Sequence, residues 1–323
     1  MSSVAWPQSR QFPFADSPEL SQLGVAWDFS AKQFSHLRSA IDFPTETVAC
    51  IAVSGSLNRM EGHAKSDLDI LVVVDDRIKA VSQASRRQIY NTVWDNLRSV
   101  PELELLQPPK SGGVFSTCAS WRAMTQATSR GVVDEDLTTF GQRMQLLLDA
   151  QPVADAPTFS ELRIDLLQWY TESRVCEIFA ESGPFHWLWQ DVQRYWRSIR
   201  SRACWLHSDN PRKSLEVNLK LRSSRLVLIA GFLQAISLAE ADSSAVIEHM
   251  EQELRLTPLE RLAFALQDQA DCDQLLTSYQ SIWSHVAHLP NNACKVPSEI
   301  LQSVRQLQDS VNRVPRSLNS WLF

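Results

Sequence analysis

The segment 51–74 constrains the fold more than any other part of this chain. It holds two apolar runs, separated by a polar stretch that begins with Gly55-Ser56 and ends with Asp67 and Asp69. The second run is apolar without alternation, which is typical of a strand covered on both faces. Because successive strand side chains point to opposite faces, the two aspartates share one face. We therefore predict two strands joined by a Gly-Ser turn, at Thr47–Ser54 and Asp67–Val74.

Two neighbouring carboxylates on one face suit a hard divalent cation. Mg²⁺ prefers oxygen ligands and keeps several waters and substrate phosphates in its shell. The absence of a Cβ at Gly55 lets backbone N–H groups approach a phosphate. An isolated Asp-x-Asp is common in proteins, but two acids at the mouth of a buried strand cost free energy unless a positive charge meets them. The pattern predicts a site that transfers a nucleotide from an NTP, with Mg²⁺ as the cofactor and Mn²⁺ as the alternative.

These residues resemble the signature of the DNA polymerase β-type nucleotidyltransferase superfamily. The intervening residues are closest to the branch that includes the uridylyltransferase domain acting on the PII signalling protein. That branch reads roughly Gly-Ser-x-x-Arg-x-Glu and then Ser-Asp-x-Asp. The matching positions are Gly55, Ser56, Arg59, Glu61, Ser66, Asp67 and Asp69. The resemblance implies an α+β fold with a small mixed sheet, attack on the α-phosphate of an NTP such as ATP, and release of pyrophosphate.

The resemblance also suggests roles for residues of the turn. Ser56 and the backbone of Gly55 are expected to hold the terminal phosphates, while Arg59 and Ser66 assist in nucleotide binding. His63 lies between the predicted strands and could act as a base, although a histidine in a loop is more often simply solvated.

Active members of the superfamily carry a third carboxylate on a neighbouring strand. The candidates here are Glu102 and Glu104, within a weak strand predicted over Glu102–Gln107. Both alternate with leucine, so spacing does not choose between them. We favour Glu104 as the third metal ligand and catalytic residue, because it lies deeper in the strand. A glutamate at this place leaves open a second hypothesis, a catalytically impaired nucleotide-binding regulatory or partner-binding protein.

A strongly basic segment spans residues 194–225. Its nine Arg and Lys residues face two acids, a net +7 in a chain whose total is −6, so the remainder carries −13. Two solvated helix faces would explain this charge. On one continuous helix, however, Arg222 falls within a stripe of leucine and isoleucine, and a buried arginine needs a carboxylate or phosphate partner. The segment is similar to helices of bacterial nucleotidyltransferases of the same branch, which favours phosphate. The residues expected to clamp the triphosphate are Lys220, Arg222 and Arg225.

The length of 323 residues predicts two domains. We expect a nucleotidyltransferase domain over 1–150, with an N-terminal helix at Ser17–Ala40, a long helix at Asp76–Val100 and a further strand near Gly113–Thr117. An all-helical domain is expected over 151–323. One helix, Glu135–Leu148, is predicted just before this boundary. The helices predicted after it are Phe159–Glu181, Phe185–His207, Lys213–Ala239, Ala245–Leu254, Pro258–His288 and Ser298–Asn312.

Composition narrows the function classes. Hydrophobic residues make up 44% and charged residues 21%, which is ordinary for a globular protein, and the net charge of −6 argues against nucleic-acid binding through overall charge. An RNA-binding module would rest on the basic helices alone, since Tyr195 and Trp196 are too few for a stacking platform. Six cysteines without a Cys-x-x-Cys pair predict reduced thiols that fill the core of a cytoplasmic protein.

The longest apolar stretch falls short of the roughly 20 residues that span a bilayer, so no membrane partner is expected. Besides the third carboxylate and the question of catalytic activity, the sequence leaves three further matters open. They are the acceptor (protein, RNA or small molecule), the base of the NTP and the oligomeric state.

Overall fold

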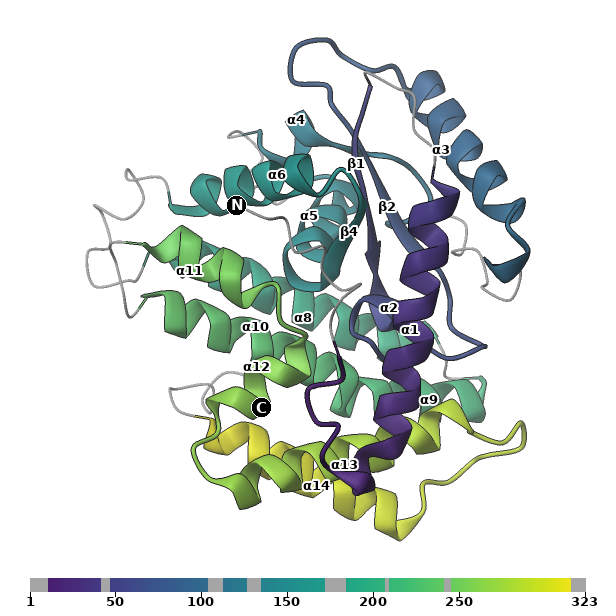
Figure 1. Ribbon diagram of the computed structural model, residues 1–323, viewed down its shortest axis with the longest axis vertical. Helices are drawn as coiled ribbons and strands as arrows, with labels where there is room; N and C mark the ends of the chain where they lie inside the picture. The colour runs from purple at the N-terminus through teal and green to yellow at the C-terminus, as the bar shows by residue number, and fades with distance from the viewer. Residues whose placement is uncertain are drawn as a thin grey trace. The chain divides into compact units, whose positions relative to one another are not determined.

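The computed structural model describes residues 11–41, 47–103, 113–126, 135–171, 184–206, 209–240 and 245–314. These residues form an α+β protein rich in helices, with one four-stranded mixed sheet (Figure 1). The expected α+β class with a small mixed sheet is confirmed. The chain divides into two compact units, which are unit 1, Met1–Phe12 with Val25–His186, and unit 2, Pro13–Gly24 with Trp187–Phe323.

The sheet of unit 1 has the strand order β3-β2-β1-β4. Its strands are β1 (Val48–Ser54), β2 (Asp69–Val74), β3 (Ala119–Ser120) and β4 (Ala150–Ala154). β1 runs antiparallel to both β2 and β4, and β3 runs parallel to β2. The two principal predicted strands are confirmed, with Asp67 forming only an isolated bridge before β2 begins.

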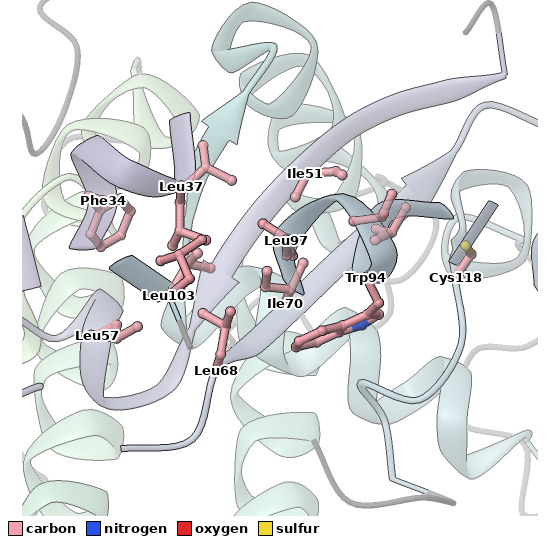
Figure 2. Packing of buried hydrophobic residues seen from close by; sticks show 14 of the residues in the cluster. Phe34, Leu37, Ile51, Leu57, Leu68, Ile70, Trp94, Leu97, Leu103 and Cys118 are labelled. Atoms are coloured by element: carbon pink, nitrogen blue, oxygen red, sulfur yellow. The ribbon is translucent and has the colours of Figure 1, made fainter. Parts of the chain in front are cut away.

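Helices cover both faces of this sheet. On one face, α1 (Ser21–Ala40) and α3 (Gln83–Arg98) bury a cluster of apolar side chains against β1 and β2. Figure 2 shows this cluster, which includes Phe34, Leu37, Ile51, Ile70, Trp94 and Leu97. The alternate residues of β1 face α5 (Leu137–Asp149) and α6 (Ala156–Thr171). Cover on both faces explains why the strand sequences show no alternation.

Of two weaker strand predictions, the one near Gly113–Thr117 is wrong, and the one over Glu102–Gln107 is wrong at its first two residues. A 3-10 helix, η2, occupies Pro101–Leu103, so the strand expected from Glu102 does not begin there. Residues 113–117 form bends and turns, and β3 begins only at Ala119. Glu104 and the rest of the segment 104–112 lie outside the described residues.

The boundary expected after residue 150 falls within the sheet. β4 begins at Ala150 and pairs with β1, so unit 1 continues past it to His186. β4 is an edge strand that contains Pro152, and an edge is where a sheet tolerates the missing N–H of proline. A proline often indicates a turn or linker in a sequence, which explains why a domain boundary was expected here.

The long helix of unit 1 starts later than the sequence predicts. The side chain of Ser82 accepts a hydrogen bond from the N–H of Ser85 (3.1 Å) and caps α3 at Gln83. Ile78, expected on the apolar stripe, is fully exposed. The short helices of this unit are α2 (Gly55–Asn58) and α4 (Trp121–Met124).

The regular elements among the described residues of unit 2 are helices, joined by turns and coil. Pro18–Leu20 forms the 3-10 helix η1, and the later helices are α8 (His186–Leu206), α9 (Pro211–Arg222), α10 (Ser224–Glu240), α11 (Val246–Glu253), α12 (Pro258–Ala265), α13 (Gln269–Ala287) and α14 (Ser298–Arg313). Helix α10 packs closely on α12 at Gly231. A Cβ on this residue would lie 2.6 Å from the carbonyl oxygen of Pro258.

The helix predicted over Lys213–Ala239 is broken in two. Ser223 adopts φ −129° and ψ −97°, which ends α9 and starts α10 at a new rotation. Arg222, expected on the buried stripe, is exposed as the last residue of α9, and the break separates it from the apolar positions of α10. By length and hydropathy alone the stretch Pro211–Ala239 could cross a membrane, but 72% of its apolar window is buried within the protein, as in a core helix.

Candidate functional site

The candidate site lies where β1 ends and α2 begins. Gly55 has φ +76°, in the left-handed region that favours glycine. A Cβ at this position would lie 2.6 Å from Oδ2 of Asp69. The register explains this contact, since Ser54 and Asp69 are paired across β1 and β2. The Asp69 carboxylate thus rests directly against the backbone of the Gly-Ser turn, where the positive φ favours glycine and a Cβ would displace the carboxylate.

Asp67 presents the second carboxylate from the same face. Leu68 and Ile70, which alternate with the aspartates, are buried in the core on the opposite face. Asp69 is half-buried, whereas Asp67 is exposed. Within the described part of the chain the Asp67 carboxylate makes no hydrogen bond or ion pair, so it is available to a ligand.

Hydrogen bonds give the loop after the turn a defined course. The hydroxyl of Ser56 donates to Oγ of Ser66 (3.1 Å), which also accepts from the N–H of His63 (3.0 Å). The N–H of Glu61 donates to the carbonyl oxygen of Ser56 (2.8 Å). Nδ1 of His63 accepts from the N–H of Lys65 (3.2 Å), so this nitrogen is engaged within the loop. Ser66 is buried, and its hydroxyl oxygen connects Ser56 with His63.

Arg59 is buried beneath the turn. Its guanidinium forms ion pairs with Glu61 (3.2 Å) and with Asp149. Asp149 also accepts a hydrogen bond from Nδ2 of Asn58 (3.1 Å). Because Asp149 is the last residue of α5 and directly precedes β4, these bonds tie the turn to the α5–β4 junction. Sequence reasoning missed Asp149. The signal was Arg59 itself, because a buried arginine needs acidic partners and Glu61 was the one acid recognised beside it.

A polar contact also anchors the end of β1. The hydroxyl of Ser54 donates to Oε1 of Gln145 on α5 (2.7 Å). Ser54 therefore does not cap α2, although it stands at the N-cap position. The first N–H groups of α2 lie at the turn itself, beside the Asp69 carboxylate.

The donors around the turn fit a hard cation in part. Asp67, Asp69 and the Ser56 hydroxyl offer oxygen only, the ligand type that Mg²⁺ prefers, and Mg²⁺ completes its shell with water and phosphate. Among the residues that the structure describes, no group of three or more His, Cys, Asp or Glu could hold a metal ion. Glu102 belongs to η2 and Glu104 lies outside the described segments. The third carboxylate stays a prediction.

The basic residues expected to clamp the triphosphate belong to unit 2 and differ in their surroundings. Lys220 forms an ion pair with Glu216 (2.7 Å). Burial acts to raise the pKa of Glu216, but Lys220 and Lys213 outweigh it and lower that pKa to about 2. Arg222 is exposed at the end of α9, and Arg225 is half-buried in the first turn of α10.

A second buried arginine, Arg143, serves the scaffold of unit 1. It pairs with Glu135 (2.7 Å), and its Nε donates to the hydroxyl of Tyr170 (3.0 Å). Its guanidinium also lies 4.8 Å from the ring centroid of Trp169. Asp136 caps α5 by accepting from the N–H of Thr139 (2.8 Å). Asp136 and Arg143 therefore hold α5 in place.

Cys50 and Cys118 are buried in the core as expected, whereas Cys204 and Cys294 are exposed. The expectation that every cysteine fills the core is wrong for the exposed pair.

No protein-family model, no curated protein and no solved structure matches this chain.

Proposed function

We propose that unit 1 is a nucleotidyltransferase domain that moves an NMP from an NTP to an acceptor and releases pyrophosphate, with Mg²⁺ or Mn²⁺ as cofactor. The observation that carries the proposal is the packing of the Asp69 carboxylate against the backbone of Gly55. A structural turn needs a glycine with positive φ, but it does not need a carboxylate packed on that glycine. A phosphate-binding turn beside a metal site needs both.

The reaction joins an acceptor oxygen to the α-phosphorus and breaks the bond from that phosphorus to the bridging oxygen of the β-phosphate. The acceptor loses its proton and pyrophosphate leaves. Asp67 and Asp69 would hold the cation, which offsets charge that develops on the phosphate oxygens. The N–H groups at Gly55 and Ser56 would orient the terminal phosphates. Positioning and charge stabilisation of this kind supply most of the catalysis in phosphoryl transfer.

Arg59 and Ser66 take supporting places in this scheme. Arg59 is enclosed by Glu61 and Asp149, so it orders the turn from below instead of meeting the triphosphate. Ser66 orients the hydroxyl of Ser56 through their hydrogen bond (3.1 Å). In unit 2, Arg222 and Arg225 with Lys220 are proposed to assist in binding the triphosphate. The acceptor is a protein, an RNA or a small molecule, and the setting is the cytoplasm.

The test is a double variant, Asp67→Asn with Asp69→Asn. We expect Mg²⁺-dependent transfer of label from an α-labelled NTP to a fraction of cell lysate to be lost. The melting temperature should be kept, because removal of two clustered negative charges relieves repulsion. The matched control is Asp28→Asn with Asp309→Asn, two exposed aspartates that the proposal gives no role. Undiminished pyrophosphate release by the first variant would remove Asp67 and Asp69 from the site.

The second candidate is a regulatory protein that binds the nucleotide without turnover. It is favoured by the donor set, since the described residues supply two carboxylates and no third. The same assay separates the candidates. Both expect NTP with Mg²⁺ to raise the melting temperature by mass action on the folded state, and only the enzyme releases pyrophosphate. Replacement of Glu104 by Gln should then abolish release and spare the stabilisation.

A further inference from the structure

The ion pairs of unit 2 show where the positive charge of residues 194–225 is left uncompensated. Arg194 pairs with Asp191 (3.3 Å) within α8. Glu216 of α9 draws three cations around itself, Lys220 (2.7 Å), Lys213 (3.0 Å) and Arg212 (3.9 Å). Arg194 and three of the cations of α9 therefore each have an acidic partner, although the single carboxylate of Glu216 offsets only one of the three charges around it.

The last two and a half turns of α8 are different. After Asp191 the helix contains no acid, and it carries Arg197, Arg200 and Arg202, all exposed. Within the described segments none of these three forms an ion pair. Arg200 instead lies over the ring of Trp196, 5.9 Å from its centroid. Three exposed arginines without acids give this end of the helix a strong local positive charge, although the chain as a whole is negative.

An exposed tryptophan completes this surface. Trp205 is 82% exposed and makes no ring contact with the described part of the chain. It follows Arg202 by three positions, so the two side chains are neighbours on the helix. The positions beside the ring on the same face are occupied by the small residues Ser198 and Ser201, which leave its faces open. We call Arg197, Arg200, Arg202 and Trp205 the α8 patch.

The buried side of α8 shows that the patch is not part of the core. Val192, Trp196 and Ala203 are buried and lie on the opposite arc of the helix. An exposed indole offers a flat apolar face with a polar edge, which a planar ligand can cover. The side chains that surround it indicate which ligand this is.

We propose that the α8 patch binds single-stranded nucleic acid. Arginine presents planar donors that match phosphate, and an exposed tryptophan stacks on any unpaired base. A membrane surface would call for a row of apolar residues, and here the ring is flanked by serines. A duplex hides its base faces and would leave Trp205 without a partner. The proposal is independent of nucleotide transfer, since its readout is binding.

The first experiment measures binding of a labelled single-stranded RNA of about 10 nucleotides by fluorescence anisotropy. The variant carries Arg197→Gln, Arg200→Gln and Arg202→Gln. The control removes the same charge at three exposed arginines elsewhere, namely Arg87→Gln, Arg122→Gln and Arg305→Gln. We expect the patch variant to bind at least about tenfold more weakly at low salt. The slope of log K against log salt should decrease in magnitude by about 2, because each of the three lost phosphate contacts contributes about 0.7. The control should stay within about twofold of wild type.

The second experiment tests stacking. Trp205→Leu should weaken binding about tenfold, whereas Trp205→Phe should retain most of it, because phenylalanine still offers a ring face. In the wild-type protein, bound RNA should slow alkylation of the exposed Cys204, which lies between Arg202 and Trp205 in the sequence of α8, and leave the exposed Cys294 unaffected. This measurement needs no substitution and is free of folding effects.

Four outcomes would overturn the proposal. They are no binding by wild type at low salt, equal losses in patch and control variants, equal affinity for duplex and single strand, and tighter binding of polyglutamate or of phosphatidylserine vesicles than of RNA. The last would point to an acidic protein or a membrane as the partner.

Discussion

At Gly55 two requirements that are separable in principle meet at one residue. The backbone needs a positive φ to turn from β1 into α2, and the space where a Cβ would stand is taken by Oδ2 of Asp69. The first requirement belongs to the turn and the second to the carboxylate. A substitution at this position can therefore report on the geometry of the proposed site.

Gly55→Ala should lower the free energy of unfolding by about 1–2 kcal/mol from φ alone, with a further loss because Asp69 must move. Nucleotide transfer should be abolished. In the background Asp69→Ala the contact is gone, so the same glycine substitution should cost less. Urea unfolding of the four proteins measures both terms. Equal costs in the two backgrounds would show that Asp69 does not restrict the turn.

Residue-scale prediction from sequence succeeded where the information is local. Gly55, Asp67 and Asp69 lie within 15 positions of one another, and strand periodicity placed the two aspartates on one face. The partner of Arg59 could not be found this way. Asp149 is 90 positions away, and no local pattern encodes which of many acids reaches a buried arginine.

At the scale of elements, the junction between α2, α5 and β4 rests on one buried ion network. Arg59→Gln would leave the carboxylates of Glu61 and Asp149 buried without their cation, and we expect a loss of about 3–5 kcal/mol. Arg98→Gln is the matched control, because Arg98 pairs with Asp95 at the surface and should cost less than about 1 kcal/mol. Denaturant unfolding compares the two. A small loss for Arg59→Gln would mean that water or another group replaces the guanidinium.

The elements that the sequence misjudged share a physical cause. A helical stripe is meaningful only while the rotation per residue is uninterrupted, and the backbone of Ser223 interrupts it. No glycine or proline stands at that break to announce it. Likewise β4 is stabilised by pairing with β1, a tertiary contact that outweighs the local preference of Pro152 for a turn.

At the scale of the whole molecule, neither unit is one continuous stretch of the chain. The segment Pro13–Gly24 belongs to unit 2, although the chain then enters unit 1 at Val25. Its attachment is specific, because Oε1 of Gln280 on α13 accepts from the N–H groups of Gln22 and Leu23, each at 3.1 Å. Such a pairing spans more than 250 positions and leaves no signal in the sequence. A division into consecutive domains was therefore bound to misplace this segment.

Whether unit 2 contributes to nucleotide binding can be decided at Arg222. This arginine is exposed and, within the described residues, forms no ion pair, so Arg222→Gln should change the free energy of unfolding by no more than about 0.5 kcal/mol. If its guanidinium meets a phosphate of the NTP, the loss of a charged hydrogen bond should weaken affinity about tenfold. Thermal unfolding with and without NTP and Mg²⁺ measures both quantities. Arg305→Gln, at an exposed arginine of α14 that neither proposal uses, should keep the full nucleotide-induced rise in melting temperature. The same rise in Arg222→Gln as in wild type would confine nucleotide binding to unit 1, and a fall in melting temperature without ligand would give Arg222 a structural role instead.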